Sequence, residues 1–165
     1  MFDQIKQVAV DTAKQAGAKL LEEFKTFERS DIKLKSSREI VTRADKISEE
    51  IIIRKIRESF PNHSILAEES GEHDKDSEYL WVVDPLDGTT NFSFHNPIWA
   101  VSIGIFKGSD VVAGVVYSPV LDEIIVAVKG GGVTLNGAEI KISQIPPEKE
   151  IHTFCHGSDM ESLKL

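Results

Sequence analysis

The sequence has very little cysteine and few aromatic side chains. Its 165 residues include one Cys, two Trp and two Tyr. A single thiol excludes an internal disulfide and a zinc site built from several cysteines, and it fits a reducing compartment. We therefore expect Cys155 to be a buried, unreactive thiol and the protein to be cytoplasmic.

Long hydrophobic runs and an excess of basic charge are lacking as well. No stretch approaches the roughly 18 apolar residues of a membrane-spanning helix. The first residues mix Asp3, Lys6 and Asp11 with apolar side chains, unlike a secretory signal. The formal net charge is -8, which disfavours a surface built to bind nucleic acid or anionic lipid. We expect neither a nucleic-acid partner nor a membrane partner.

Acidic side chains are concentrated in one part of the chain. Residues 1–60 carry thirteen basic and eleven acidic side chains, whereas residues 61–165 carry six and sixteen. Eight of these acids lie between Glu68 and Asp87, with Lys75 as the only Lys or Arg among them. Because like charges repel unless water or cations lie between them, this stretch is either a solvated loop or a place where metal ions bind.

The first third of the sequence has the spacing of two helices. Apolar residues at steps of three and four predict a long helix from Ile5 to Phe27. Thr42 stands three residues before Asp45, as at a capped helix start, and Pro61 closes this second helix. The residues that we expect on its buried side are Ile47, Ile51, Ile52, Ile56 and Phe60.

After Pro61 the pattern changes to short runs of Val, Ile and aromatic residues separated by turn residues. Such runs predict strands at 64–67, 79–83, 97–106, 111–117, 124–128, 132–135 and 138–142, with a hairpin turn at Asn136-Gly137. Helices followed by mostly antiparallel strands predict an α+β fold, with the two N-terminal helices packed on the sheet.

The end of the chain is less regular. Ile151–Cys155 predicts one more strand, and Ser158 and the acids after it are typical of a helix start. Because that helix has barely begun at Leu165, we expect residues 1–165 to form a single incomplete domain.

The segment 84–90 (Asp-Pro-Leu-Asp-Gly-Thr-Thr) carries the strongest chemical signal. The apolar run 80–83 predicts a strand that delivers Asp84 at its end, and Pro85 fixes a turn that returns Asp87 to the same side. Mg²⁺ prefers oxygen donors, which here would be Glu68, Asp84, Asp87 and the Leu86 carbonyl. An ordinary turn is the alternative, because Asp, Pro and Gly are common turn residues.

Gly88, Thr89 and Thr90 predict the other half of such a site. If a helix begins there, its first backbone N–H groups point outward at the positive end, where a phosphate binds without a basic side chain. A phosphate site in an acidic protein is consistent with this, because bound metal ions reverse the sign of the local field.

Residues 81–92 resemble the WxxDPxDGTxxF signature of the inositol monophosphatase family, part of a magnesium-dependent, lithium-sensitive phosphatase superfamily. The resemblance extends to flanking segments, which are 35–37, 41–45, 65–70, 100–104, 114–117 and 136–137. It implies that Mg²⁺ is bound by Glu68, Asp84, Asp87 and the Leu86 carbonyl. It also implies that Gly88 and Thr89 hold phosphate, and that Asp45 and Thr89 act with Glu68 on the attacking water.

The resemblance further implies the first part of a layered αβαβα sugar-phosphatase fold, a homodimer, and hydrolysis of inositol monophosphate or a related small sugar or polyol phosphate. Fructose 1,6-bisphosphate or a nucleotide phosphate is an alternative substrate, and a truncated, non-catalytic interaction module is an alternative function. The family's WDxAAG-like motif has no match, because neither Trp81 nor Trp99 precedes Asp. One metal ligand and most substrate contacts of the family are therefore missing.

Several residues have simpler interpretations. Asp45 is also expected as a helix cap, and Lys35 is either a substrate contact or a surface lysine. Residues 130–132 (Gly-Gly-Gly) lack the Gly-Lys-Ser/Thr order of a phosphate-binding loop. We expect His63, His73 and His95 to be isolated surface residues.

Overall fold

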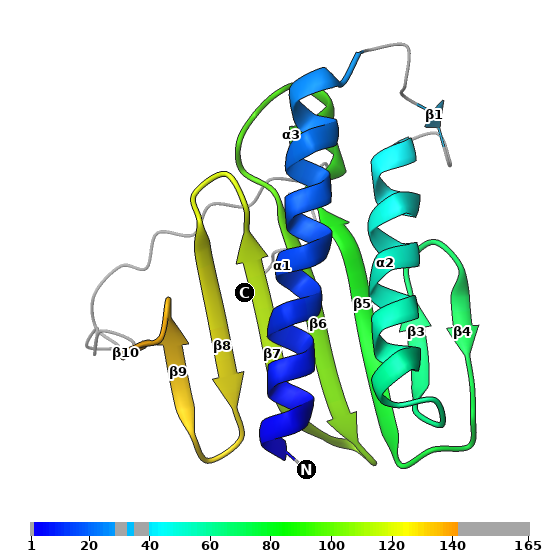
Figure 1. Cartoon of the computed structure of the whole chain (residues 1–165), viewed down its shortest axis with the longest axis vertical. Coiled ribbons are helices and arrows are strands. Elements are labelled where there is room, and N and C mark those ends of the chain that lie inside the picture. The colour runs from blue at the N-terminus through cyan, green and yellow to red at the C-terminus, as the bar shows by residue number, and fades with distance from the viewer. Residues whose placement is uncertain (1, 29–32, 35–39, 142–165) are drawn as a thin grey trace, which may run out of the picture.

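The computed structural model describes residues 2–28, 33–34 and 40–141 (Figure 1). The helices are α1 (Phe2–Thr26), α2 (Arg43–Ser59) and α3 (Thr89–Ser93). The strands are β1 (Lys33–Leu34), β2 (Ile40–Val41), β3 (Ser64–Ala67), β4 (Gly71–His73), β5 (Tyr79–Asp87), β6 (Ala100–Lys107), β7 (Asp110–Ser118), β8 (Glu123–Val128), β9 (Gly132–Leu135) and β10 (Ala138–Ile140). β1 pairs with β2, and the other eight form one sheet in the order β10-β9-β8-β7-β6-β5-β3-β4.

The two long helices lie side by side on the same face of this sheet (Figure 1). α1 packs against β6 and β7, and α2 packs against β5. The buried stripe of α1 recurs at steps of three and four residues and consists of Ile5, Ala9, Ala13, Ala16 and Leu20. Within the described residues, no helix combines the length and the hydrophobicity needed to cross a membrane.

Gly17 sets how closely α1 approaches the sheet. A Cβ atom at this position would stand 2.6 Å from the ring of Tyr117 and 2.7 Å from the ring of Pro119. Both distances are far below van der Waals contact, so a larger residue would push the helix away from β7.

The sheet is antiparallel except between β3 and β5, which run parallel. Alternate residues face the helices, and Trp81, Val83, Ile103 and Ile105 on that side are buried. On the opposite side Leu66, Val116 and Ile125 are exposed. Among the described elements both long helices cover the first face, so the second face presents apolar surface (Figure 1).

The predicted α+β fold, with two N-terminal helices on a mostly antiparallel sheet, is confirmed. The capping box at the start of α2 is also present, with Thr42 as N-cap and Asp45 at the third helical position. The sequence did not predict β4 or the short β1–β2 pair, and β6 begins three residues later than expected. The expected strand at 151–155, the helix start at Ser158, Lys35 and Cys155 lie outside the described residues.

The prediction that His63 is isolated is wrong. Its ring lies between Phe60 and Tyr79, with ring centroids 4.6 and 4.7 Å away and planes within 12° of parallel. The indole N–H of Trp81 donates to His63 Nδ1 at 3.0 Å. His63 is therefore part of an aromatic cluster where α2 ends and β5 begins.

Candidate active site

The carboxyl end of β5 carries most of the predicted site. The pairing of β5 with β6 shifts between Asp84, opposite Ser102, and Asp87, opposite Ala100. Between these two pairs, β5 advances by three residues and β6 by two. The segment is therefore a β-bulge within the strand, and not the turn after a strand that the sequence predicted. The Leu86 N–H donates to Asp84 Oδ1 at 3.1 Å, which fixes the side chain over the bulge.

Glu68 reaches the same place from the neighbouring parallel strand. It follows β3 directly, and its N–H donates to the Val83 carbonyl at 3.1 Å. Because parallel strands end at the same edge of a sheet, this contact brings Glu68 beside Asp84. Both residues line one hollow together with Leu66, Ala67, Gly71, Val82 and Val83.

The carboxyl groups crowd one another. The pKa of Asp84 is raised to about 7, mainly by burial and further by the charge of Glu68, a hydrogen bond with Glu68 and the charge of Asp87. The Leu86 N–H acts in the opposite direction. A proton on Asp84 therefore relieves the repulsion near neutral pH, which a cation would relieve equally well. In the described ranges, no three acidic, His or Cys side chains are already grouped as a metal cage.

Asp45 and Thr89 meet beside this cluster. The Thr89 hydroxyl lies 2.8 Å from Asp45 Oδ1 and 3.0 Å from the Leu86 carbonyl oxygen. Asp45 Oδ2 accepts from the Thr42 N–H at 2.8 Å and from the Thr42 hydroxyl at 2.6 Å. Asp45 is therefore both a member of the capping box of α2 and the hydrogen-bond partner of Thr89.

The predicted phosphate-binding residues form a tight corner. Gly88 is the N-cap of α3 and has a φ of 90°, a backbone conformation that residues other than glycine rarely adopt. A Cβ atom there would also stand 3.0 Å from the Ile98 carbonyl oxygen. Thr89 and Thr90 open α3, which is five residues long. The predicted helix start is thus present, on a short helix.

Two buried polar residues near the site were missed from the sequence. Ser48 donates its hydroxyl to the Pro85 carbonyl at 2.7 Å, and Glu49 Oε2 accepts from the Glu69 N–H at 2.8 Å. Their signal was available, because they stand three and four residues after Asp45 and so share its face of α2.

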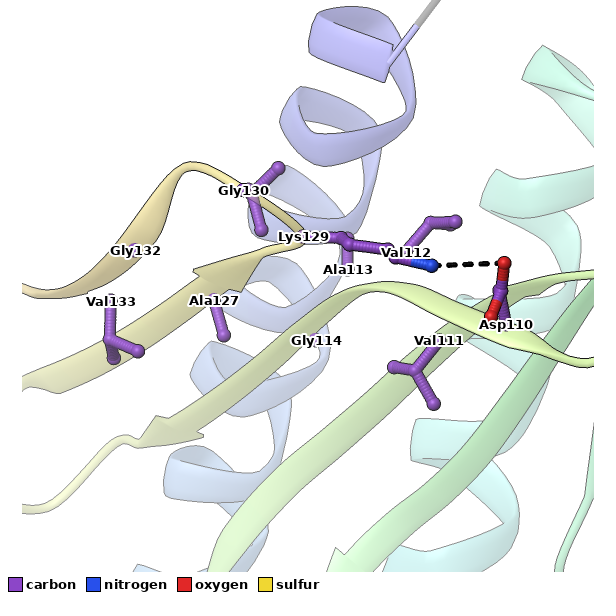
Figure 2. Close-up of a pocket in the computed structure, with 11 residues that line it drawn as sticks. Asp110, Val111, Val112, Ala113, Gly114, Ala127, Lys129, Gly130, Gly132 and Val133 are labelled. Carbon is purple, nitrogen blue, oxygen red and sulfur yellow. Dashed lines mark ion pairs between the residues drawn. The ribbon is translucent and has the colours of Figure 1, made fainter.

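A second hollow lies between β7, β8 and β9, away from the carboxyl groups (Figure 2). Its lining is mainly glycine, alanine and valine, and its ion pair joins Lys129 Nζ to Asp110 at 2.9 Å between two exposed side chains. None of the predicted site residues lines it, so the carboxyl cluster remains the candidate site.

Comparisons with known proteins show the family to which the chain belongs. The model of the inositol monophosphatase family matches residues 1–164. "Inositol monophosphatase" of Dictyostelium discoideum is 40% identical over 147 residues, which are 87% of this chain and 54% of the relative. "Nus factor SuhB" of Salmonella typhimurium is 43% identical over 136 residues, which are 81% of this chain and 51% of the relative. The chain thus spans about half the length of these curated relatives.

The fold is shared with solved structures. The crystal structure of the extragenic suppressor protein suhB from Bartonella henselae superposes with a TM-score of 0.79 at 36% identity. The match covers 84% of this chain and 54% of that protein. The arrangement of helices and sheet described above is therefore that of an established fold.

Proposed function

Because the chain belongs to the inositol monophosphatase family, we propose that its site takes part in the metal-dependent hydrolysis of a small phosphate monoester. The observation that carries this proposal is the position of Asp84 beside Glu68 and Asp87, where burial first and then these two neighbours raise the pKa of Asp84 to about 7. The chain spans half of its relatives, so the activity of the whole protein is part of the proposal. That residues 1–165 are one incomplete domain stays a prediction.

The donor set fits a hard divalent cation, which we propose is Mg²⁺. Its ligands would be Glu68, Asp84, Asp87 and the Leu86 carbonyl, all oxygen donors. Asp84 is half-buried and faces the negative charges of the exposed Glu68 and Asp87, so a cation is favoured in place of the proton on Asp84. Mg²⁺ bound there would supply Lewis-acid stabilisation of phosphoryl charge and a water of lowered pKa.

The residues around the cluster would handle the water and the phosphate. Thr89 donates its hydrogen to Asp45, so its lone pairs are available to accept from an attacking water. The buried Asp45 holds that hydroxyl in place and is the final acceptor for the proton. Glu68, the residue after β3, would act on the same water. Gly88, Thr89 and Thr90 hold the phosphate at the first turn of α3.

The proposed substrate is inositol monophosphate or a related small sugar or polyol phosphate. Fructose 1,6-bisphosphate and nucleotide phosphates are the alternatives within the same reaction class. A homodimer, lithium sensitivity, a cytoplasmic location and the lack of a nucleic-acid partner stay predictions.

The test is Mg²⁺-dependent phosphate release by the 165-residue chain. Inositol 1-phosphate, fructose 1,6-bisphosphate and a nucleoside monophosphate are offered in parallel. We expect release from inositol 1-phosphate that disappears in Asp84→Asn and persists in Asp76→Asn. Asp76 is the matched control because it is an exposed acid with φ of 51°, which Asn also adopts. Release that is equal in both variants would contradict the proposal.

A non-catalytic interaction module is the second candidate. The exposed sheet face at Leu66, Val116 and Ile125 favours it, as does the Nus factor name of one relative. Under this alternative the chain neither releases phosphate from any of the three substrates nor binds Mg²⁺.

A further inference from the structure

The amino-terminal half of α2 buries three polar side chains on one face. Asp45 is 1% exposed, Ser48 0% and Glu49 4%. Ser48 and Glu49 stand three and four residues after Asp45, which places both about one turn along the helix from it, on the side that packs against β5. One and two turns further on, the same face carries the buried Ile52 and Ile56. Burying polar groups in such a place is costly unless each finds a partner.

Each of the three contacts a different point of the candidate site. Asp45 accepts from the Thr89 hydroxyl at 2.8 Å. Ser48 donates to the carbonyl of Pro85, between the proposed ligands Asp84 and Leu86, at 2.7 Å. Glu49 accepts at 2.8 Å from the N–H of the residue that follows Glu68. One helix face thus contacts both segments that carry the carboxyl groups.

Both backbone contacts fall where sheet pairing is irregular or has ended. The Pro85 carbonyl lies in the bulge, where the pairing with β6 shifts. The Glu69 N–H lies two residues beyond the end of β3. The hydroxyl of Ser48 and the carboxylate of Glu49 supply hydrogen bonds at these points, so they fix the backbone that carries the carboxyl groups.

We propose that Ser48 and Glu49 are positioning residues of the metal site. By their backbone contacts they hold the bulge of β5 and the segment after β3 in fixed relation, so that Glu68 and Asp84 present their carboxyl groups to the same cation. This inference rests on the proposed function, since it requires that the site bind Mg²⁺. Losing groups that orient metal ligands typically weakens metal binding about 10- to 100-fold.

The test measures the dissociation constant for Mg²⁺ by calorimetry and the unfolding midpoint in EDTA, on the full chain. We expect Glu49→Ala and Ser48→Ala each to weaken Mg²⁺ binding about tenfold. Glu49→Gln retains an oxygen that accepts from the Glu69 N–H, so it restores binding to within about threefold of wild type. If Glu49→Ala fails to fold, Ser48→Ala carries the test.

Ile52→Val is the matched control for stability. It removes one buried methylene from the same helix face and takes away no hydrogen bond to either segment, so it lowers the unfolding midpoint and leaves the dissociation constant unchanged. Glu49→Ala and Ser48→Ala that behave like Ile52→Val would overturn the inference and leave the proposed function standing. A wild-type chain whose Mg²⁺ binding is absent, or is unaffected by Asp84→Asn, would overturn both.

Discussion

The hydroxyl oxygen of Thr89 lies 2.8 Å from a carboxylate oxygen of Asp45, although 44 positions separate the two residues. The other oxygen of Asp45 is engaged by Thr42 at the start of α2. The buried carboxylate of Asp45 therefore accepts hydrogen bonds from the start of its own helix with one oxygen and from Thr89 with the other. This contact joins the cap of α2 to the first turn of α3.

Replacing Thr89 tests that contact. Thr89→Val keeps the branched shape but removes the hydroxyl, which leaves Asp45 Oδ1 without this donor. We expect the free energy of unfolding to fall by about 1–3 kcal/mol, measured by urea denaturation. Thr89→Ser keeps the donor and should lose clearly less. Equal stabilities of the Val and Ser variants would show that the hydrogen bond contributes nothing.

Removing one carboxyl group from the crowded cluster should stabilise the metal-free chain. Burial and the charges of Glu68 and Asp87 oppose ionisation of Asp84, whose pKa is raised to about 7. At pH 8 without metal, we therefore expect Asp84→Asn to gain on the order of 1 kcal/mol, once solvent screening is allowed for.

The same variant should lose its response to Mg²⁺. A ligand that binds only the folded state raises the unfolding midpoint, so Mg²⁺ should stabilise the wild type and Asp76→Asn but not Asp84→Asn. Thermal unfolding with and without Mg²⁺ measures both effects. An equal Mg²⁺ shift in all three proteins would place the cation elsewhere.

The fold was largely predictable because its signals are local, whereas the contacts between segments were not. Apolar spacing predicted α1 and α2, and short β-branched runs predicted the main strands. The proximity of Glu68 to Asp84 depends on the parallel pairing of β3 with β5. The concentration of acids and the family motif indicated a shared site, but neither predicted that pairing. The apolar pattern of α2 gave no sign that Ser48 and Glu49 are buried, whereas Ile47 and Ile51, which it placed on the buried side, are only partly buried. The partners of Ser48 and Glu49 are backbone atoms of distant segments, which no periodicity reveals.

His63 should make stability depend on pH. Burial and then the charge of Arg57 lower the pKa of His63 below 6.5, while Glu78 opposes this. The unfolded chain therefore binds the proton more readily than the folded chain does. The contribution of His63 is fully present above pH 6.5 and is lost as the pH falls from 6.5 through the lowered pKa. The loss is below about 1 kcal/mol because the ring is partly solvated.

His63→Asn isolates this effect. Asn places an oxygen near the position of Nδ1, so it can still accept from Trp81, but it does not titrate and it loses the stacking on Phe60 and Tyr79. We expect the variant to be less stable at pH 8 and to lose less further stability between pH 8 and pH 5 than the wild type does. Urea denaturation at both pH values measures this, and parallel losses would contradict the assignment to His63.

The sheet face opposite the helices should tolerate polar substitutions. Val116 and Ile125 are direct partners across β7 and β8, and they are 37% and 39% exposed. Val116→Thr and Ile125→Thr keep the β-branched shape that strands favour while adding a hydroxyl that water can reach. We expect the double variant to lose under about 1 kcal/mol of unfolding free energy and to bind less of a hydrophobic dye such as ANS.

Ile103→Thr on the covered face is the control. Ile103 is buried beneath the helices, so the variant loses buried apolar area and also buries a hydroxyl, at a cost of about 2–4 kcal/mol. The contrast between the two faces therefore reports which side of the sheet water reaches. If Ile125→Thr alone cost as much as Ile103→Thr, the second face would be covered in solution, and dye binding by the wild type would then be low as well.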